Sequence, residues 1–266
     1  WTDQGEMAMY AGTDPGDASK WSLVGVYKVG RPIGRRCIIN VGSDCYLITE
    51  NGVLPMTQVL GTGEAAPNRA ISDKISLTYN ESVVAYRGTF GWEGELYPKG
   101  GYALFNAPAS NAGAFVQYVV NLETGSWARF RNQNAYTWAV FDSDLYFGGN
   151  TKVHKADTGT SDGGDAIEAT AKTAFIYYGE RRGPTRYTAI RPVMASESDV
   201  AVSEGFDVDY RDGTTTLTPT TGTSEGATWD VAAWDTSSWG APITTKLDWV
   251  SVSEIGWNRA RRVLAC

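Results

Sequence analysis

Apolar and polar residues alternate along many short stretches of this chain, and residues typical of turns separate the stretches. In residues 44–56, two apolar runs flank the dipeptide Asn51-Gly52. Both residues tolerate positive φ, so this dipeptide between alternating runs predicts a tight β-hairpin. Residues 137–148 repeat the arrangement around Asp142-Ser143. A period of two places successive side chains on opposite faces, and we therefore predict strands joined by tight turns.

The same pattern predicts further strands along most of the chain. They are residues 21–27, 37–41, 82–87, 91–97, 102–108, 115–121 and 126–130 in the first part, and residues 187–194, 206–210, 247–252 and 261–264 in the second. Residues 166–178 are expected to form one long strand or a hairpin, and residues 12–17 a loop. Residues 71–81 fit either a short helix or another strand.

Three of the expected hairpins share one shape, in which an apolar strand precedes a polar turn and a second strand. The parallels are residues 46–48 before Asn51-Gly52, residues 118–120 before Thr124-Gly125, and residues 145–147 before Gly148-Gly149. Repeated hairpins at this density are typical of propeller blades or of a sandwich. We therefore predict an all-β protein whose first domain, residues 1–156, is a partial or complete β-propeller-like region, with a sandwich as the alternative.

The composition changes after Lys155. Residues 157–165 form a long polar stretch that we take as the boundary between two domains. The period-2 pattern beyond it predicts a β-sandwich or barrel-like module, similar to a tip domain, over residues 157–266.

Composition and charge agree with an all-β protein and exclude some partners. The 266 residues include 30 Gly, 10 Trp and 14 Tyr, a mixture that favours strands and turns. The formal net charge of −7 argues against a protein that grips nucleic acid, although an acidic wall suits a channel through which DNA slides. No apolar run approaches the roughly 18 residues of a membrane helix.

Few residues offer metal or cofactor chemistry. Cys37, Cys45 and Cys266 are an odd set without metal-ligand spacing, and His154 is the only histidine. This excludes a Cys/His zinc site, while Cys37 and Cys45 are either a disulfide or, as is commoner, buried free thiols. Residues 157–165 and 207–213 superficially resemble calcium loops, but Arg211 occupies a ligand position. We expect no metal and no cofactor.

Three carboxylate pairs are the candidates for hydrolytic chemistry. They are Asp142 with Asp144, Asp207 with Asp209, and Asp162 with Asp165. Residues two apart on a strand share a face, so Asp207 and Asp209 are able to form a common site, whereas the first pair flanks a turn. A single histidine allows no histidine-based triad, and roles in turns and on the surface are favoured. We therefore expect a protein that is not an enzyme.

The tryptophans near the end of the chain are more informative. Trp229, Trp234 and Trp239 follow one another at intervals of five residues, and an aspartate follows each of the first two. This spacing fits neither a helix face nor a strand face. It indicates a looped segment whose rings fill pockets in the core or on a neighbouring subunit, with sugar stacking as the alternative.

Several short motifs resemble those of one protein family, the tail hub or nozzle proteins of short-tailed bacteriophages, which include packaged-DNA stabilisation proteins. The motifs are Gly12-Thr13-Asp14-Pro15 with residues 21–25, Gly30-Arg31-Pro32-Ile33-Gly34-Arg35-Arg36, residues 121–127, Leu145-Tyr146-Phe147-Gly148, and residues 227–230 with Trp234-Asp235. Together they span almost the whole chain. Such proteins are similar in having a propeller-like region joined to a β-rich tip.

The resemblance implies a structural virion protein of the phage tail, assembled in the host cytoplasm. Its subunits would form a homo-hexameric ring that contacts the portal adaptor and the tail fibre or spike proteins, retains packaged DNA and forms the channel for its ejection. Contacts between subunits are then expected at Trp229, Trp234, Trp239, Arg181, Arg182 and Arg186, with Arg191, Arg259, Arg261 and Arg262 forming further inter-subunit pairs. The alternative is a carbohydrate-binding or depolymerising β protein of a phage tail. The start at Trp1 is expected of a processed product or a segment of a longer protein.

Overall fold

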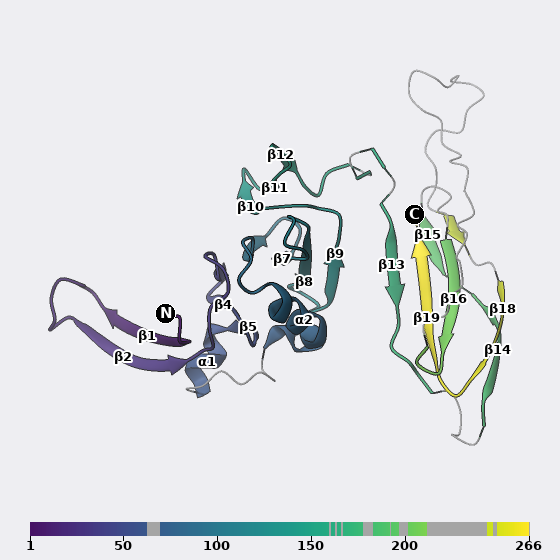
Figure 1. Cartoon of the computed structure of the whole chain (residues 1–266), viewed down its shortest axis with the longest axis horizontal. Helices are drawn as coiled ribbons and strands as arrows, with labels where there is room; N and C mark the ends of the chain where they lie inside the picture. The colour runs from purple at the N-terminus through teal and green to yellow at the C-terminus, as the bar shows by residue number, and fades with distance from the viewer. Residues whose placement is uncertain are drawn as a thin grey trace. The chain divides into compact units, whose positions relative to one another are not determined.

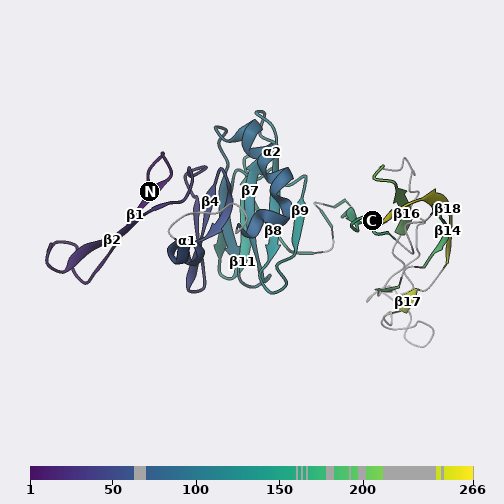
Figure 2. The ribbon, with the colours of Figure 1, turned by 90° about the horizontal axis from the view of Figure 1, so that it is seen from below.

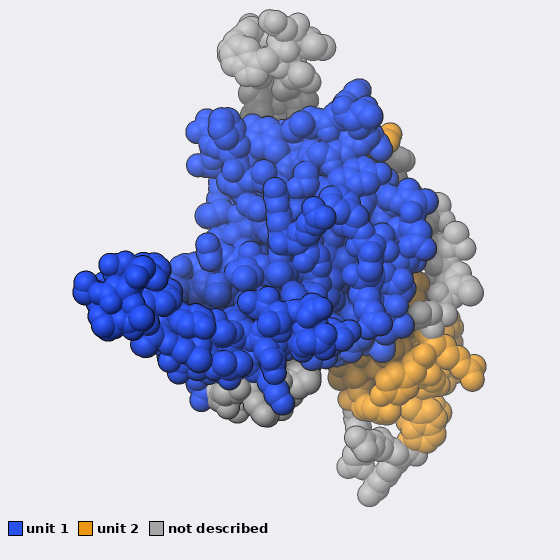
Figure 3. Space-filling view, turned by 60° about the vertical axis from the view of Figure 1, so that its left-hand side comes forward, with its two compact units in different colours: residues 1–158 blue, residues 159–266 orange. Residues whose placement is uncertain are grey.

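The computed structural model describes residues 1–62, 70–159, 161–162, 164–165, 167–177, 183–191, 193–196, 202–211, 244–246 and 249–265. The chain divides into two compact units, unit 1 (Trp1–Thr158) and unit 2 (Gly159–Cys266), which are coloured separately in Figure 3. Strands predominate in the described residues of both units (Figure 1). The predicted all-β class is confirmed.

Unit 1 consists of a series of antiparallel sheets in chain order. Its strands are β1 (Glu6–Gly12), β2 (Trp21–Lys28), β3 (Ile38–Val41), β4 (Asp44–Thr49), β5 (Gly52–Pro55), β6 (Glu93–Tyr97), β7 (Tyr102–Pro108), β8 (Phe115–Asn121), β9 (Trp127–Phe130), β10 (Thr137–Phe141), β11 (Asp144–Gly149) and β12 (Lys152–Lys155). They form the sheets β1-β2, β3-β4-β5, β6-β7-β8-β9 and β10-β11-β12. Each sheet is therefore a local meander, as short turns between alternating strands dictate.

The three larger meanders meet through their first strands. β3 contacts β6, and β6 contacts β10. Just before β3, Arg36 forms a parallel bridge with Glu93 at the start of β6, and its carbonyl accepts the N–H of Gly94 at 3.3 Å. The consecutive meanders thus adjoin along equivalent strands.

The turn chemistry explains two hairpins of unit 1. Asp142 and Ser143 join β10 to β11 with φ of 49° and 64°, the left-handed pair of a type I′ turn, so the predicted hairpin is confirmed. The next turn was expected at Gly148-Gly149, but these residues pair with β10 or β12. The chain instead reverses at Asn150 and Thr151, both with positive φ, and continues as the unexpected strand β12.

The hairpin predicted around Asn51-Gly52 is also confirmed, with its turn one residue earlier. Thr49 pairs with Gly52, so Glu50 and Asn51 occupy the turn. The Thr49 hydroxyl donates to the Gly52 carbonyl at 2.8 Å and accepts the Asn51 N–H at 3.2 Å. This local bonding satisfies the turn without the expected central Asn-Gly pair.

Among the described residues, two α-helices and one 3-10 helix interrupt the strands, and one of them overturns a prediction. The chain forms α1 (Met56–Thr62) directly after β5, and later the 3-10 helix η2 (Ile71–Ile75) followed by α2 (Ser76–Tyr86). The strand predicted over residues 82–87 is therefore wrong, and residues 71–81 are helical. The physical reason lies in tertiary contacts: Tyr79 and Val83, one turn apart, are buried, and the Tyr79 hydroxyl donates to the Thr49 carbonyl at 2.7 Å. α2 packs against β5 and β7 (Figure 2).

Three apolar clusters form the core of unit 1. The first joins β3, β4, β5, β7, β8 and α2, the second lies where β1 meets β4, β5 and α1, and the third lies between the last two meanders. Phe105, Leu47 and Trp138 are fully buried examples, one from each cluster. Alternate residues of the strands thus provide the contacts between neighbouring sheets.

A buried polar network crosses the third cluster, centred on Asn106 of β7. Its side-chain amide donates to the carbonyls of Gly91 at 2.7 Å and Ala135 at 3.0 Å. Its oxygen accepts the side-chain N–H groups of Gln117 at 2.8 Å and Trp138 at 3.2 Å. All the hydrogen-bonding groups of this fully buried amide are therefore used, which fixes the register of two meanders.

The described residues of unit 2 form strands of three to seven residues in three small sheets. They are β13 (Ala169–Lys172), β14 (Thr185–Ile190), β15 (Met194–Ser196), β16 (Val202–Val208), β17 (Thr244–Lys246), β18 (Val250–Gly256) and β19 (Arg259–Ala265), arranged as β13-β19-β16, β14-β18 and β15-β17. The strand predicted over residues 187–194 is divided between β14 and β15. Within residues 166–178 the described part has only the short strand β13 and an isolated bridge from Ile176 to Arg259.

Candidate functional site

The carboxylates considered for catalysis in unit 1 are separated by a turn, as expected. Asp142 lies in the turn between β10 and β11. Asp144 begins β11 and forms ion pairs with Lys155 and, at 2.7 Å, Lys99. Hydrogen bonds from Lys155 and then Lys99 hold the pKa of Asp144 below its usual range. This carboxylate ties β11 to β12 and to the loop between β6 and β7.

Asp207 and Asp209 do not share a site. Asp207, in β16, is 2% exposed and pairs with Lys172 at 2.8 Å and Arg262 at 2.7 Å. Asp209 has left the strand with φ of 53°, and its Oδ1 accepts the N–H of Trp257 at 2.7 Å. The positive φ of Asp209 breaks the alternation on which the expectation of a shared face depended.

The remaining candidates for chemistry also have structural partners. Asp162 and Asp165 exchange two backbone hydrogen bonds, of 2.9 and 3.1 Å, across a short turn. Cys37 and Cys45 are half-buried free thiols, and burial raises the pKa of both. Within the residues that the structure describes, no three Asp, Glu, His or Cys side chains gather where they would hold a metal ion.

Most of the predicted subunit-contact residues lie in parts of the chain that the structure does not describe. Trp229, Trp234, Trp239, Arg181 and Arg182 lie outside the described residues. Arg186 is an exposed residue of β14 opposite Ile255. Two arginines expected to pair between subunits have partners in their own chain, since Arg261 pairs with Glu204 at 2.9 Å and Arg262 with Asp207.

The β1-β2 hairpin, which we call the arm, is an exposed feature that the sequence did not single out. It extends from the rest of unit 1 (Figures 1 and 2). Its loop is held by aspartates: the Asp14 side chain accepts the Gly16 N–H at 3.0 Å, and Asp17 accepts bonds from Ser19 and pairs with Lys20 at 3.1 Å. The loop predicted at residues 12–17 is thus confirmed, with Gly12 as the last residue of β1.

One face of the arm is anchored to the body of unit 1. Met7, Met9 and Tyr27 belong to, or pack against, the second apolar cluster. The Val29 N–H donates to the Gly5 carbonyl at 2.8 Å, and the indole N–H of Trp1 donates to the Gly30 carbonyl at 3.1 Å. The base of the arm is therefore fixed by packing and by backbone hydrogen bonds.

The opposite face of the arm presents apolar side chains to solvent. Tyr10, Leu23, Val24 and Val26 are between 50% and 57% exposed. Tyr10 lies opposite Leu23, and a register shift after Met9 leaves Val24 as an extra residue beside them. Further out, the rings of Tyr10 and Trp21 stack with 6.3 Å between centroids. The arrangement is an apolar strip suited to contact with another protein surface.

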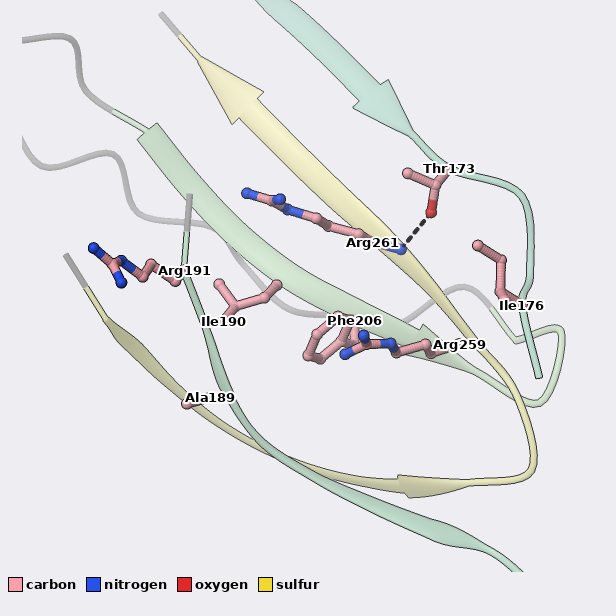
Figure 4. A pocket seen from close by; sticks show the side chains of 8 residues that line it. All are labelled: Thr173, Ile176, Ala189, Ile190, Arg191, Phe206, Arg259 and Arg261. Atoms are coloured by element: carbon pink, nitrogen blue, oxygen red, sulfur yellow. Dashed lines mark hydrogen bonds between the residues drawn. The ribbon is translucent and has the colours of Figure 1, made fainter. Parts of the chain in front are cut away.

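Unit 2 contains a cavity of about 260 Å³ rich in arginine. Figure 4 shows its lining, which comprises Thr173, Ile176, Ala189, Ile190, Arg191, Phe206, Arg259 and Arg261. These residues come from β14, β16, β19, the segment after β13 and, for Arg191, the position just after β14. The Arg261 N–H donates to the Thr173 hydroxyl at 2.9 Å, which ties that segment to β19.

None of the described helices is long and apolar enough to cross a membrane. Comparison with protein-family models and with curated proteins finds no match to this chain.

Proposed function

We propose that this chain is a structural subunit of a phage tail hub or nozzle ring. The ring would retain packaged DNA and form the channel for its ejection. The tail assignment rests on the sequence motifs that resemble the nozzle family, and the structural role rests on the arm. The formal charge of −7 supports a channel through which DNA passes without sequence-specific binding, because like charges repel the phosphate backbone.

The exposed apolar strip of the arm carries the proposal. A two-stranded hairpin is only marginally stable by itself in water, and contiguous exposed apolar side chains mark interaction surfaces. Only one face of the arm is covered by unit 1, through Met7, Met9 and Tyr27. The second face, with Tyr10, Leu23, Val24 and Val26, gains the same kind of cover when a neighbouring subunit docks on it.

The meanders of unit 1 support a propeller-like region within such a subunit. Propeller blades are antiparallel meanders arranged so that their first strands adjoin around an axis. The first strands β3, β6 and β10 adjoin in this order. In the proposal, β3-β5, β6-β9 and β10-β12 are consecutive blades of a partial propeller, and unit 2 is the sandwich or tip-like module.

The proposed assembly is a homo-hexameric ring in the tail of the virion. It would contact the portal adaptor on one side and the tail fibre or spike proteins on the other. Trp229, Trp234 and Trp239 remain the predicted aromatic contacts between subunits, with Arg181, Arg182 and Arg186 as predicted polar contacts.

Solution mass tests the proposal. Light scattering of the purified chain, followed by negative-stain imaging, should reveal a sixfold ring with a central hole. Val26→Lys places a charge in the apolar strip and should reduce the assembled fraction by about tenfold or more, since burying an unpaired charge opposes docking. Val84→Lys is the matched control, because Val84 on α2 is 84% exposed and lies outside the arm.

The outcomes separate the arm from the ring. A ring that persists in Val26→Lys would contradict the proposed role of the arm, but it would agree with the proposed ring. A stable monomer or trimer that binds or cleaves polysaccharide would overturn the ring and support the carbohydrate-binding or depolymerising alternative.

A further inference from the structure

The sheets of unit 1 pack face to face in chain order, and each contact uses a different face. In β3-β4-β5, Leu47 belongs to the second apolar cluster, which faces the arm, whereas Ile48 belongs to the first cluster, which faces β6-β7-β8-β9. In β6-β7-β8-β9, Phe105 belongs to the first cluster and Leu104 to the third, which joins this sheet to β10-β11-β12 through Trp138. Successive side chains of a strand point to opposite faces, so the described residues of unit 1 form a series of stacked sheets that begins with the arm.

The last sheet of this series, β10-β11-β12, has one covered face and one open face. The covered face includes Trp138 and Leu145, which are fully buried. On the other face, Phe141 and Val153 are 74% and 76% exposed. Alternation along the strands places two further residues beside them, and Ala139 lies directly opposite Tyr146. We call this open face the end face, and its apolar and aromatic residues are Ala139, Phe141, Tyr146 and Val153.

The apolar strip of the arm is the open face at the beginning of the series. The other face of the arm packs on β3-β4-β5 through Met7, Met9 and Tyr27. The arm and β10-β11-β12 lie apart in unit 1 (Figure 1), so one copy presents both the apolar strip and the end face to solvent. An apolar sheet face is stabilised when another element covers it, and both ends of the series lack such cover within the described part of unit 1.

The charges beside the two open faces occur close to charges of opposite sign. On the end face, Asp144 forms ion pairs with Lys155 and Lys99. At the base of the arm, Glu6 lies directly opposite Lys28. Docking of one face on the other therefore leaves each of these charges beside an opposite one, whereas burial of a lone charge would oppose the contact. The balance also favours a protein over a nucleic acid as the occupant, because phosphate binding requires clustered positive charge.

We propose that the apolar strip of one copy packs on the end face of a second copy. This contact continues across two copies the face-to-face packing that joins the sheets within each copy. The arm is suited to this role because its other face already covers a three-stranded sheet, β3-β4-β5. In the contact, Leu23 and Val26 of the strip lie against Phe141 and Val153 of the end face. The inference rests on the proposed assembly through the arm and adds the surface that receives the arm.

The contact joins copies head to tail, because the strip and the end face are different surfaces. A pair of copies joined in this way still has one open strip and one open end face. Further copies therefore add until the series closes into a ring, in which every strip and every end face is covered. Packing of strip on strip would instead be self-complementary and would stop at a dimer.

A substitution on the end face tests the contact in the full chain. Val153→Lys places a charge there and should lower the assembled fraction by about tenfold or more, as expected for Val26→Lys in the strip. Because Val153 is exposed within its own copy, the urea midpoint should stay unchanged. Phe141→Ala is the second variant and should also weaken assembly, since it removes apolar area without adding charge. Val84→Lys is the matched control and should assemble like the unaltered chain.

A mixture of two variants tests which surfaces meet. Val26→Lys keeps an intact end face and Val153→Lys keeps an intact strip, so one productive contact remains between the two variants. Each variant alone should be mostly monomeric, whereas an equimolar mixture should form dimers and no larger assembly. Light scattering measures the masses, and the dimer in the mixture should exceed that in either variant alone by about tenfold or more.

The outcomes separate this inference from the proposed ring. If Val153→Lys assembles to the mass of the unaltered chain while Val26→Lys is monomeric, the inference is overturned, but the proposed role of the arm stands. A lower urea midpoint in that case would indicate that the same chain covers the end face. Dimers of Val153→Lys alone would indicate strip-on-strip packing, and they or a mixture that stays monomeric would overturn the inference as well. An unaltered chain that is monomeric at every concentration measured would overturn both the inference and the ring.

Discussion

The carboxylate of Glu93, in β6, accepts a hydrogen bond from the backbone N–H of Trp138, in β10. The same carboxylate accepts the Thr137 hydroxyl at 3.2 Å and pairs with Arg36 at 3.6 Å. Arg36 in turn donates to the Trp138 carbonyl at 3.4 Å. One buried carboxylate thus joins the segments that begin three consecutive meanders.

Removal of this carboxylate should destabilise unit 1. Glu93→Ala leaves the buried Trp138 N–H without a partner, and we expect a loss of about 1–3 kcal/mol in the free energy of unfolding. Urea unfolding followed by tryptophan fluorescence measures the change. Glu123→Ala, in the exposed turn after β8, is the control and should change stability by less than about 0.5 kcal/mol. Equal effects in the two variants would contradict the joining role of Glu93.

Glu93 should also make stability depend on pH. Burial raises its pKa above the usual value of 4.5, against the hydrogen bonds from Trp138 and Thr137 and the charge of Arg36. Because the folded pKa exceeds the unfolded one, this contribution to stability is complete below the unfolded pKa and is lost as pH rises through the folded pKa. Burial raises the pKa of Glu95 in the same direction.

In Glu93→Gln the free energy of unfolding should therefore fall less steeply as pH rises above about 4.5. Glu95 keeps its own contribution to this fall. Urea midpoints measured from about pH 4 to about pH 8 give the slope. Glu123→Gln should leave the slope of the unaltered protein. A slope unchanged by Glu93→Gln would show that Glu93 has the same pKa in the folded and unfolded chain.

Replacing the side-chain amide nitrogen of Asn106, a hydrogen-bond donor, by an acceptor should destabilise unit 1. Asn106→Asp places a second oxygen opposite the carbonyls of Gly91 and Ala135, which now accept the amide N–H groups. Two lost hydrogen bonds in a buried site should cost about 2–4 kcal/mol. Thermal unfolding by circular dichroism measures the loss. Asn111→Asp, at an exposed position, is the control, and a similar effect there would indicate that net charge rather than the network is responsible.

The turn between β11 and β12 contains a strained residue. Thr151 has φ of 65°, a left-handed conformation that β-branched residues rarely adopt. Thr151→Gly should raise stability by about 1 kcal/mol by relieving this strain. Thr89→Gly is the control, since Thr89 is only partly buried and outside the positive-φ set, and it should be neutral or destabilising. A lower melting temperature for Thr151→Gly would contradict the turn geometry.

Asp207 and Asp209 should respond differently to the same substitution. Asp207→Asn weakens the ion pairs with Lys172 and Arg262 in a buried position, and we expect a loss of about 3 kcal/mol. Asp209→Asn keeps the oxygen that accepts the Trp257 N–H and should cost less than about 1 kcal/mol. Unfolding of unit 2, followed by near-ultraviolet circular dichroism, compares the two. Similar losses would contradict the role of Asp207 in a buried ion-pair network.

The sequence pattern predicted those hairpins in which strands adjacent in the chain pair with each other. Alternation and turn residues predicted the hairpin at Asp142-Ser143 and the hairpin around Asn51-Gly52, because neighbouring strands joined by a tight turn pair with each other. The pattern failed at α2, whose apolar residues do not gather on one face: Tyr79 and Val83 are buried while Leu77 and Val84 are exposed. A run such as Val83-Val84 then favours a strand by propensity, and tertiary contacts override it.

The sequence by itself determined the all-β class, most hairpins and the acidic balance, since these depend on residues close together in the chain or on simple sums. Only the tertiary structure decided which face of each strand is covered, and so which apolar residues of the arm remain exposed. It also decided the partners of Glu93, Asn106 and Asp207. Period-2 alternation is symmetric between the two faces of a strand, and contacts between residues far apart in the chain leave no local pattern.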